Sequence, residues 1–252
     1  MIDTHAHLDF KDYDNDRDEV IKRSFANGLE KIINVGANLD RSKQAILIAE
    51  NNEDIFATVG VHPEDLKDFD NNFRENFIKL AKTKKVVAIG ECGLDYFYTK
   101  DPKNIEQQKK LFIAEIEIAK ELNLPLIIHC RDAYEDAYEI LKDKQAKGVM
   151  HCYLSNWQMA QKFLDLGFYI SFTGAITYKK KEEVLEVVKK MSLDKIMVET
   201  DCPYLTPQIF RGERNEPMYV KYVIKKIAEI KGINFDEVEK KTTENAVKLF
   251  EL

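Results

Sequence analysis

A short apolar run followed by a longer amphipathic segment recurs along nearly the whole chain, and this alternation indicates the class of fold. Several of the short runs are rich in Val and Ile and lack strict apolar–polar alternation, which is typical of parallel strands covered on both faces. We therefore predict eight strands, at residues 2–5, 31–36, 55–60, 86–91, 126–129, 148–151, 168–172 and 195–200.

The longer segments between these runs have the periodicity of helices. In the segment 107–122, for example, Phe112, Ile116 and Ala119 are spaced by four and three residues, so they form one apolar stripe. We predict helices at residues 41–51, 72–83, 107–122, 132–142, 156–166, 181–190, 218–231 and 236–250.

Strands that alternate with helices at near-regular spacing indicate an α/β fold with a parallel sheet. A doubly wound open sheet is the competing architecture, but eight strands in a chain of 252 residues favour a (β/α)8 barrel of the TIM type. No linker rich in Pro, Gly or Ser divides the sequence, so we expect a single domain over residues 1–252.

Charge and cysteine content restrict the class of protein further. A net charge of −6 and a pI of about 5.5 argue against a general basic surface that coats nucleic acid, but they are compatible with a locally positive pocket. We expect no secretory signal, because the opening residues lack its pattern, and no apolar run approaches the roughly 18 residues of a membrane span. Four cysteines do not indicate a disulfide scaffold, so we expect a cytoplasmic protein.

All five histidines lie at or just beyond the end of a predicted strand, where barrels of this type carry their catalytic residues. His5 and His7 end the first strand, and their spacing points both imidazoles to the same side of extended backbone. His62 follows the third strand, His129 ends the fifth and His151 ends the sixth.

Two carboxylates occupy equivalent places, since Glu91 ends the fourth predicted strand and Asp201 follows the eighth. One His-x-His pair is weak evidence, and a carboxylate after a strand is more often a helix N-cap than a metal ligand. Four imidazoles and two carboxylates in one barrel mouth are different, because burying them without a charged partner is costly. We predict a two-metal site built from His5, His7, Glu91, His129, His151 and Asp201.

A zinc–thiolate site is the alternative, because each cysteine directly follows one of these residues. Adjacent residues of extended backbone point to opposite sides, however, so most of the thiols are expected to face away from the mouth. The spacings also lack the C-x2-C pattern that is usual in zinc–thiolate sites. We interpret Cys92, Cys130, Cys152 and Cys202 as small packing residues.

The same residues lie in motifs that resemble the TatD-related hydrolases of the metal-dependent amidohydrolase superfamily. The matching stretches follow the family's order over nearly the whole chain: DTHAHLD (3–9), GVHP (60–63), GECGLDY (90–96), HCRD (129–132), HCY (151–153), GFYISFTG (167–174), ETDCPYL (199–205) and RGERNEP (211–217). One departure is Phe210, where relatives often have a His, and it puts one contact near the substrate in doubt.

The resemblance implies a TIM-type barrel, a one- or two-metal centre and phosphodiester hydrolysis, often of DNA from a strand end in the manner of a 3′–5′ exonuclease. It assigns His5, His7, Glu91 and Asp201 to the first ion, and Glu91, His129 and His151 to the second. Family resemblance favours Mg for activity, whereas imidazole-rich ligation also suits Zn, Mn, Ni or Fe.

These assignments suggest a mechanism in which the ions lower the pKa of a bound water from about 15.7 toward 7. Glu91 would bridge the ions, and Asp201 would serve as ligand and general base together. Two divalent ions outweigh these two carboxylates, so the site would be net positive and could attract a phosphate despite the acidic total charge.

Four further residues are candidates for substrate binding, namely His62, Arg131, Arg211 and Tyr96. Each has a structural alternative. His62 precedes a proline and could simply order a loop, and Arg131 could pair with a neighbouring acid. Arg211 and the nearby Arg214 could bind phosphate or lie in a solvated loop. Tyr96 could stack on a base or pack at the barrel rim.

The favoured function is a metal-dependent deoxyribonuclease with DNA as its substrate, no membrane association and a monomeric state. The alternative is hydrolysis of a small-molecule amide, lactone or phosphoester by the same metals. Relatives of that kind often bridge the ions with a Lys modified by CO2, and Glu91 occupies the place where that Lys would lie. A catalytically inactive binding module would be expected to have lost ligands, and none of the six is missing.

Overall fold

The computed structural model describes residues 1–179 and 182–252 of the chain. In this part of the chain, eight parallel strands form one sheet in the order β1 to β8. The strands are β1 (Ile2–Ala6), β2 (Lys31–Val35), β3 (Ile55–Val59), β4 (Val86–Asp95), β5 (Leu126–Arg131), β6 (Gly148–Met150), β7 (Tyr169–Phe172) and β8 (Ile196–Val198). The predicted (β/α)8 barrel is confirmed.

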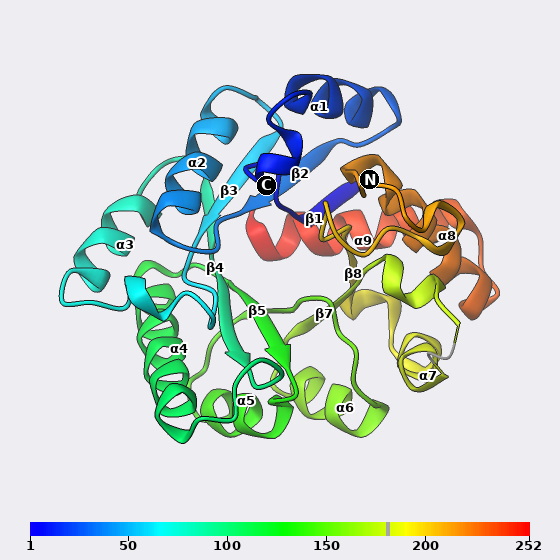
Figure 1. Cartoon of the computed structure of the whole chain (residues 1–252). Helices are drawn as coiled ribbons and strands as arrows, with labels where there is room; N and C mark the ends of the chain where they lie inside the picture. The colour runs from blue at the N-terminus through cyan, green and yellow to red at the C-terminus, as the bar shows by residue number, and fades with distance from the viewer. Residues whose placement is uncertain (180–181) are drawn as a thin grey trace.

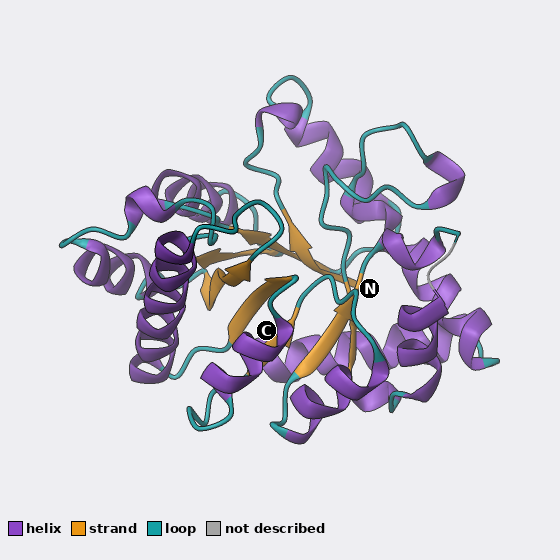
Figure 2. Ribbon diagram, turned by 60° about the horizontal axis from the view of Figure 1, so that its bottom comes forward, coloured by secondary structure: helices purple, strands orange, loops and turns teal. Residues whose placement is uncertain are grey.

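Helices surround the strands, as the side view of Figure 2 shows. They are α1 (Arg17–Ala26), α2 (Leu39–Glu50), α3 (Phe73–Ala81), α4 (Pro102–Leu122), α5 (Tyr134–Leu141), α6 (Trp157–Asp165), α7 (Glu182–Lys190), α8 (Val220–Lys231) and α9 (Phe235–Phe250). None of the helices in the described residues is both long and apolar enough to cross a membrane.

The boundaries of α4 show how local sequence sets these elements. Pro102 occupies the first helical turn, where its missing N–H costs no hydrogen bond, and Asp101 accepts a hydrogen bond from the Lys103 N–H as N-cap. The helix ends at Asn123, which adopts the left-handed conformation that asparagine tolerates. The predicted stripe that includes Phe112 is fully buried against the barrel.

Some boundaries differ from the prediction. Strand β4 continues to Asp95, four residues past its predicted end at Glu91. Helix α1 was not predicted, because its apolar positions are few and only Val20 and Ile21 among its large apolar side chains are buried. The predicted helix start at Lys181 lies outside the described residues.

The interior of the barrel has an apolar lower layer that α9 covers. Ile127, Val149 and Met197, at most 1% exposed, pack in one cluster with Leu249 and Phe250 of α9. Figure 1 shows α9 in red behind the strands, near the centre of the ring of helices. The strand ends on the opposite side of the barrel are therefore left for a functional site.

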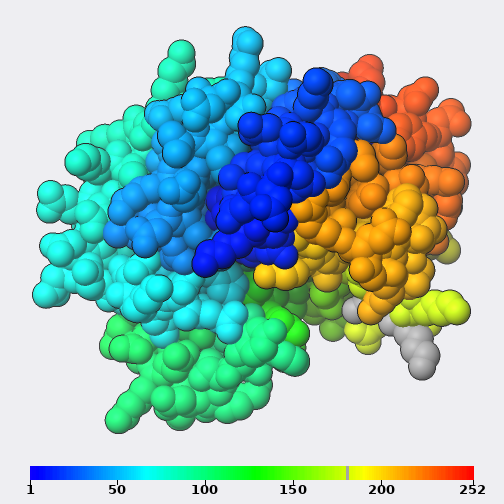
Figure 3. Space-filling model, turned by 45° about the horizontal axis from the view of Figure 1, so that its top comes forward, coloured from blue at the N-terminus to red at the C-terminus, as the bar shows by residue number. Residues whose placement is uncertain are grey.

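Contacts between the first and last parts of the chain complete the molecule. The Arg23 guanidinium of α1 donates two hydrogen bonds of 2.6 Å to Glu216, and Arg214 pairs with Asp16. In Figure 3 the N-terminal segment (blue) accordingly lies against the late segment drawn in orange. Arg214 is thus held in an ion-pair network with Asp16 and Glu216, an arrangement that differs from the solvated loop of its structural alternative. The expected single domain over residues 1–252 stays a prediction.

Candidate metal centre

The structure brings all six predicted metal ligands together at the carboxyl ends of the strands. Three lie within strands, namely His5, Glu91 and His129, and the others lie within three residues of a strand end, namely His7, His151 and Asp201. All six are mostly buried, and even His129, whose side chain is 17% exposed, lies largely out of solvent. Strands far apart in the sequence therefore converge on one polar cluster.

Closure of the barrel positions the first part of this cluster. The Asp201 N–H donates to the His5 carbonyl at 2.8 Å, and the His7 N–H donates to the Cys202 carbonyl at 2.9 Å. These bonds join the end of β8 to β1, so the backbone that closes the barrel also sets His5 and His7 beside Asp201. Asp201 has a φ of 56°, a left-handed conformation uncommon outside glycine and frequent at functional sites.

The buried side-chain amide of Asn215 holds the loop that carries Asp201. The Asn215 side chain donates to the carbonyls of Thr200 and Tyr204, which flank Asp201 in the sequence. The Tyr13 hydroxyl in turn donates to the Asn215 carbonyl at 2.6 Å. Because these groups are buried and mutually satisfied, they fix the backbone at Asp201.

The ligand atoms form two groups on either side of Glu91. In the first group, Nε2 of His5 and Nε2 of His7 are 3.1 Å apart, and Oε2 of Glu91 lies 3.6 Å from each. Oδ1 of Asp201 lies 3.7 and 3.5 Å from the same two nitrogens. In the second group, Oε1 of Glu91 lies 3.0 Å from Nδ1 of His129 and 3.0 Å from Nε2 of His151.

These separations fit divalent cations. Ligand atoms that bind one ion at about 2.1 Å lie roughly 3.0–3.5 Å from one another. The Nδ1 of His7 lies 3.0 Å from the Val35 carbonyl, which can only accept a hydrogen bond, so neutral His7 keeps a lone pair on Nε2. That lone pair points toward Nε2 of His5 and two carboxylates, an arrangement that a shared cation satisfies.

The electrostatics of the cluster also favour a cation. Burial acts to raise the pKa of Glu91, but the surrounding imidazoles, that of His151 foremost, hold this pKa well below its usual value. Burial likewise acts to lower the pKa of His7, but a hydrogen bond with Asp201 and the charge of Glu91 raise it to about 9. The carboxylates thus stay ionised, and the cluster attracts positive charge.

Two buried carboxylates that the pattern of strand ends does not single out lie just outside the cluster. Oδ2 of Asp95 is 2.9 Å from Nε2 of His129, and Oε1 of Glu199 is 3.2 Å from Nδ1 of His151. Both residues lie in the motif stretches, but their imidazole partners are far away in the sequence, so their neighbours in the chain did not indicate the pairing. The nearest signal was their place, four residues after Glu91 and two before Asp201.

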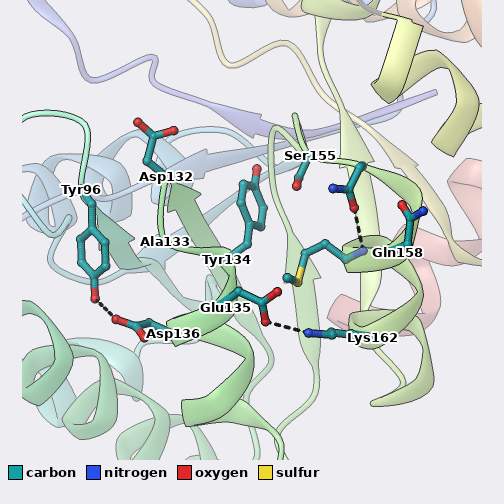
Figure 4. Close-up of a pocket in the computed structure, with 11 residues that line it drawn as sticks. Tyr96, Asp132, Ala133, Tyr134, Glu135, Asp136, Ser155, Gln158 and Lys162 are labelled. Carbon is teal, nitrogen blue, oxygen red and sulfur yellow. Dashed lines mark hydrogen bonds and ion pairs between the residues drawn. The ribbon is translucent and has the colours of Figure 1, made fainter.

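The cluster lies in a pocket of about 840 Å³. His62 and Arg131, two of the four predicted substrate-binding residues, line this pocket. Tyr96 instead lines a neighbouring groove of about 590 Å³ between α5 and α6, where its hydroxyl donates to Asp136 (Figure 4). Arg211 lines neither cavity, and its guanidinium stacks 4.4 Å above the Tyr178 ring. The substrate contacts of all four stay predictions.

The rim of the pocket carries aromatic rings and guanidinium groups that sequence reasoning did not connect. The guanidinium of Arg131 lies 3.6 Å from the centre of the Phe97 ring, and that of Arg41 lies 3.8 Å from the Phe10 ring. Phe97 is 50% exposed, and the nearby residues Tyr98 and Tyr204 are exposed to a comparable extent. Exposed rings beside cations are the groups that bind unpaired bases and phosphates.

The four cysteines are free thiols. None of them joins a candidate metal-binding group in the described part of the chain, which agrees with their interpretation as packing residues. Cys92 and Cys202 are fully buried in the main core, as expected. Cys130 and Cys152 nevertheless border the pocket, so the expectation that the thiols face away holds only in part.

The sequence and the fold are similar to those of known hydrolases. Residues 2–251 match the family described as TatD related DNase. The chain is 45% identical to the uncharacterized metal-dependent hydrolase YabD of Bacillus subtilis, in an alignment that covers 100% of this chain and 99% of that protein. It is 34% identical to the 3′-5′ ssDNA/RNA exonuclease TatD of Escherichia fergusonii, over 92% of each chain. The crystal structure of YjjV, a TatD homolog from Escherichia coli, superposes with a TM-score of 0.94 at 30% sequence identity. The superposition covers 100% of this chain and 98% of that chain.

Proposed function

The chain belongs to the TatD related DNase family, and from this membership we propose that it is a metal-dependent nuclease acting at the mouth of its barrel. The observation that carries the proposal is the pair of ligand groups that meet at the two oxygens of Glu91. A single carboxylate between two groups of imidazoles is suited to bridge two ions. The small-molecule alternative is not favoured, because relatives of this chain are named as nucleases and the bridging position holds a glutamate.

We assign the first ion to His5, His7, Glu91 and Asp201, and the second to Glu91, His129 and His151. Two divalent ions there would supply Lewis-acid charge that polarises a phosphate and lowers the pKa of a nearby water. Mg²⁺ is the ion we propose for activity, with Zn²⁺, Mn²⁺, Ni²⁺ or Fe²⁺ also compatible with this mixture of imidazole and carboxylate.

The chain's own groups then position the substrate and move the proton. Oδ1 of Asp201 faces the two imidazoles of the first group, so Oδ2 is the atom we assign as proton acceptor when water attacks phosphorus. The Glu64 N–H donates to Nδ1 of His62, and burial together with the charge of His129 lowers the His62 pKa to about 4. Neutral His62 therefore carries its proton on Nε2, where it can donate to a phosphate oxygen.

The proposed substrate is a single strand of DNA degraded from its 3′ end. The names of the TatD relatives support this polarity, and the exposed rings beside Arg131 and Arg41 support unpaired bases. Two divalent ions and these guanidinium groups would give the pocket a positive potential, although the whole chain has a net charge of −6. We retain a monomer in the cytoplasm as part of this proposal.

The test is digestion of end-labelled nucleic acid by the metal-stripped full chain, with Mg²⁺, Mn²⁺ or Zn²⁺ added back. Stepwise shortening of single-stranded DNA labelled at its 5′ end is the expected result. Glu91→Ala is expected to abolish shortening, whereas Glu139→Ala, an exposed residue of α5, serves as the control. Failure to cleave any nucleic acid, together with hydrolysis of small esters or amides, would refute the nuclease.

A further inference from the structure

Each of the four imidazoles of the metal centre has one ring nitrogen in a ligand group, and the four rings differ in the hydrogen-bond partner of the other nitrogen. Nε2 of His129 is 2.9 Å from a carboxylate oxygen of Asp95, and Nδ1 of His151 is 3.2 Å from a carboxylate oxygen of Glu199. Nδ1 of His7 instead meets a neutral backbone carbonyl, and Nδ1 of His5 is buried with no partner among the described residues. In the described part of the chain, hydrogen-bonded carboxylate partners therefore occur only on the side of Glu91 where His129 and His151 lie.

A carboxylate behind an imidazole decides which nitrogen can bind a metal. An ionised carboxylate only accepts hydrogen bonds, so the ring proton lies on Nε2 of His129 and on Nδ1 of His151. The free lone pairs are then on Nδ1 of His129 and Nε2 of His151, the two atoms that lie 3.0 Å from Oε1 of Glu91. The negative partner also makes each imidazole a stronger donor.

Both carboxylates are buried and accept hydrogen bonds from backbone N–H groups. Asp95 is 1% exposed, and its Oδ1 accepts from the Phe97 N–H at 2.8 Å. The Gln108 side chain accepts from the Asp95 N–H and donates to the Asp95 carbonyl, at 2.9 and 3.0 Å. Glu199 is also 1% exposed, and its Oε1 accepts from the Cys152 N–H at 2.8 Å. Such support is what a positioning group requires.

Close packing of β4 against β5 sets Gly93 opposite His129 and Asp95 opposite Arg131. Gly93, two residues before Asp95, has a φ of 133°, and a Cβ added there would lie 2.0 Å from the His129 carbonyl oxygen. Only glycine permits this approach. The extension of β4 beyond Glu91 therefore carries Asp95 two residues past the level of His129, where its Oδ2 lies 2.9 Å from Nε2 of that ring.

We propose that Asp95 and Glu199 are positioning residues for one metal position, that of Glu91, His129 and His151: Asp95 orients the ring of His129, and Glu199 orients the ring of His151. The inference rests on the proposed metal centre. It predicts that the two ions depend on different residues. Among the described residues, no carboxylate is hydrogen-bonded to Nδ1 of His5 or of His7, so an ion held by His5, His7 and Asp201 should be largely indifferent to Asp95.

The first measurement is a calorimetric titration of the metal-stripped full chain with Co²⁺ alone. The wild-type chain is expected to bind two ions, and Asp95→Asn should weaken one of them by about 10–100-fold. Glu199→Gln should weaken the same ion, whereas Asp201→Asn should weaken the other. Glu115→Gln is the matched control, because Glu115 is equally buried but bonds only the Val61 N–H, and it should change neither ion. Thermal unfolding of each metal-free variant verifies folding.

A second measurement needs no variant. Cadmium-to-nitrogen scalar couplings in the Cd²⁺-loaded wild-type chain identify the nitrogen that binds, and we expect Nδ1 for His129 and Nε2 for the other three.

Of the two variants in the calorimetric titration, Asp95→Asn separates the two ions more clearly than Glu199→Gln. One ligand atom each of His5, His151 and Glu199 lie within 4.8 Å of one another, so a change at Glu199 can also reach the ligand group that contains His5.

The outcomes separate this inference from the proposed function. Two bound ions that are unaffected, or equally weakened, by Asp95→Asn would overturn the inference and leave the metal centre intact. Coupling through Nε2 of His129 would do the same. Absence of any stoichiometric Co²⁺ binding would overturn the metal centre and the inference together.

Discussion

The lower and upper layers of the barrel interior are built from the same strands but have opposite chemistry. Along β5, and across the ends of β6 and β8, one step of two residues leads from an apolar side chain to a polar one: Ile127 to His129, Val149 to His151, and Met197 to Glu199. Two residues of a strand span about 7 Å. A dry core and a charged site are therefore separated by little more than one side-chain layer.

The two layers therefore contribute to different properties of the protein, the lower layer to stability and the upper layer to activity. The lower layer buries apolar surface against α9 and stabilises the fold. The upper layer gathers ionised carboxylates and imidazoles, which stabilise the fold little without a cation and can oppose it. Substitutions in the upper layer should thus reduce activity, and substitutions in the lower layer should reduce stability.

The largest expected effect tests the upper layer at His129. His129→Ala removes a proposed ligand of the second ion, so kcat on single-stranded DNA should fall by roughly 1,000-fold or more, as is typical when a catalytic group is lost. The free energy of unfolding of the metal-free protein should fall by only about 1–3 kcal/mol, because the buried Asp95 carboxylate loses its partner. Initial rates and urea unfolding measure the two quantities. Activity within tenfold of wild type would contradict the assignment.

The matched change two residues earlier should have the reverse effect. Ile127→Ala leaves a cavity in the lower layer, so the free energy of unfolding should fall by about 2–5 kcal/mol. The kcat of the folded molecules should stay close to that of the wild type, as measured well below the midpoint of thermal unfolding. If this variant lost kcat as severely as His129→Ala, the division between the layers would not hold.

Metal removal should act on the upper layer alone. An ion that binds only the folded state stabilises it by about 2.7 kcal/mol at a concentration of 100 times its Kd. Adding Mn²⁺ to the stripped protein should therefore raise Tm in the wild-type chain and in Ile127→Ala, but not in Glu91→Ala. An equal rise of Tm in all three would place the stabilising ion elsewhere.

The smallest expected effect lies at the rim of the mouth. Arg131→Ala removes a guanidinium that stacks on Phe97 and lines the pocket without contacting the proposed ligands. Loss of one phosphate or base contact should raise KM for single-stranded DNA by about tenfold, with kcat and Tm nearly unchanged. Steady-state kinetics at fixed salt distinguish this from a fall in kcat, which would instead place Arg131 in the chemistry.

The eight strands, their order along the chain and the six residues at their ends followed from the sequence. Parallel strands all end on one side of a barrel, so a polar residue at each strand end implies a shared location. The period of two along a strand likewise predicted that His5 and His7 point the same way. These properties depend on residues near one another in the chain, which is why local patterns were sufficient.

Only the tertiary structure decided how the site is completed. The pairing of Asp95 with His129 joins residues 34 positions apart, and that of Glu199 with His151 joins residues 48 apart. The division of the two Glu91 oxygens between the ligand groups, and the placing of Arg211 away from the pocket, also arise from packing between distant segments. Sequence periodicity shows on which face of an element a side chain lies, but the partner it meets depends on how closely distant elements approach.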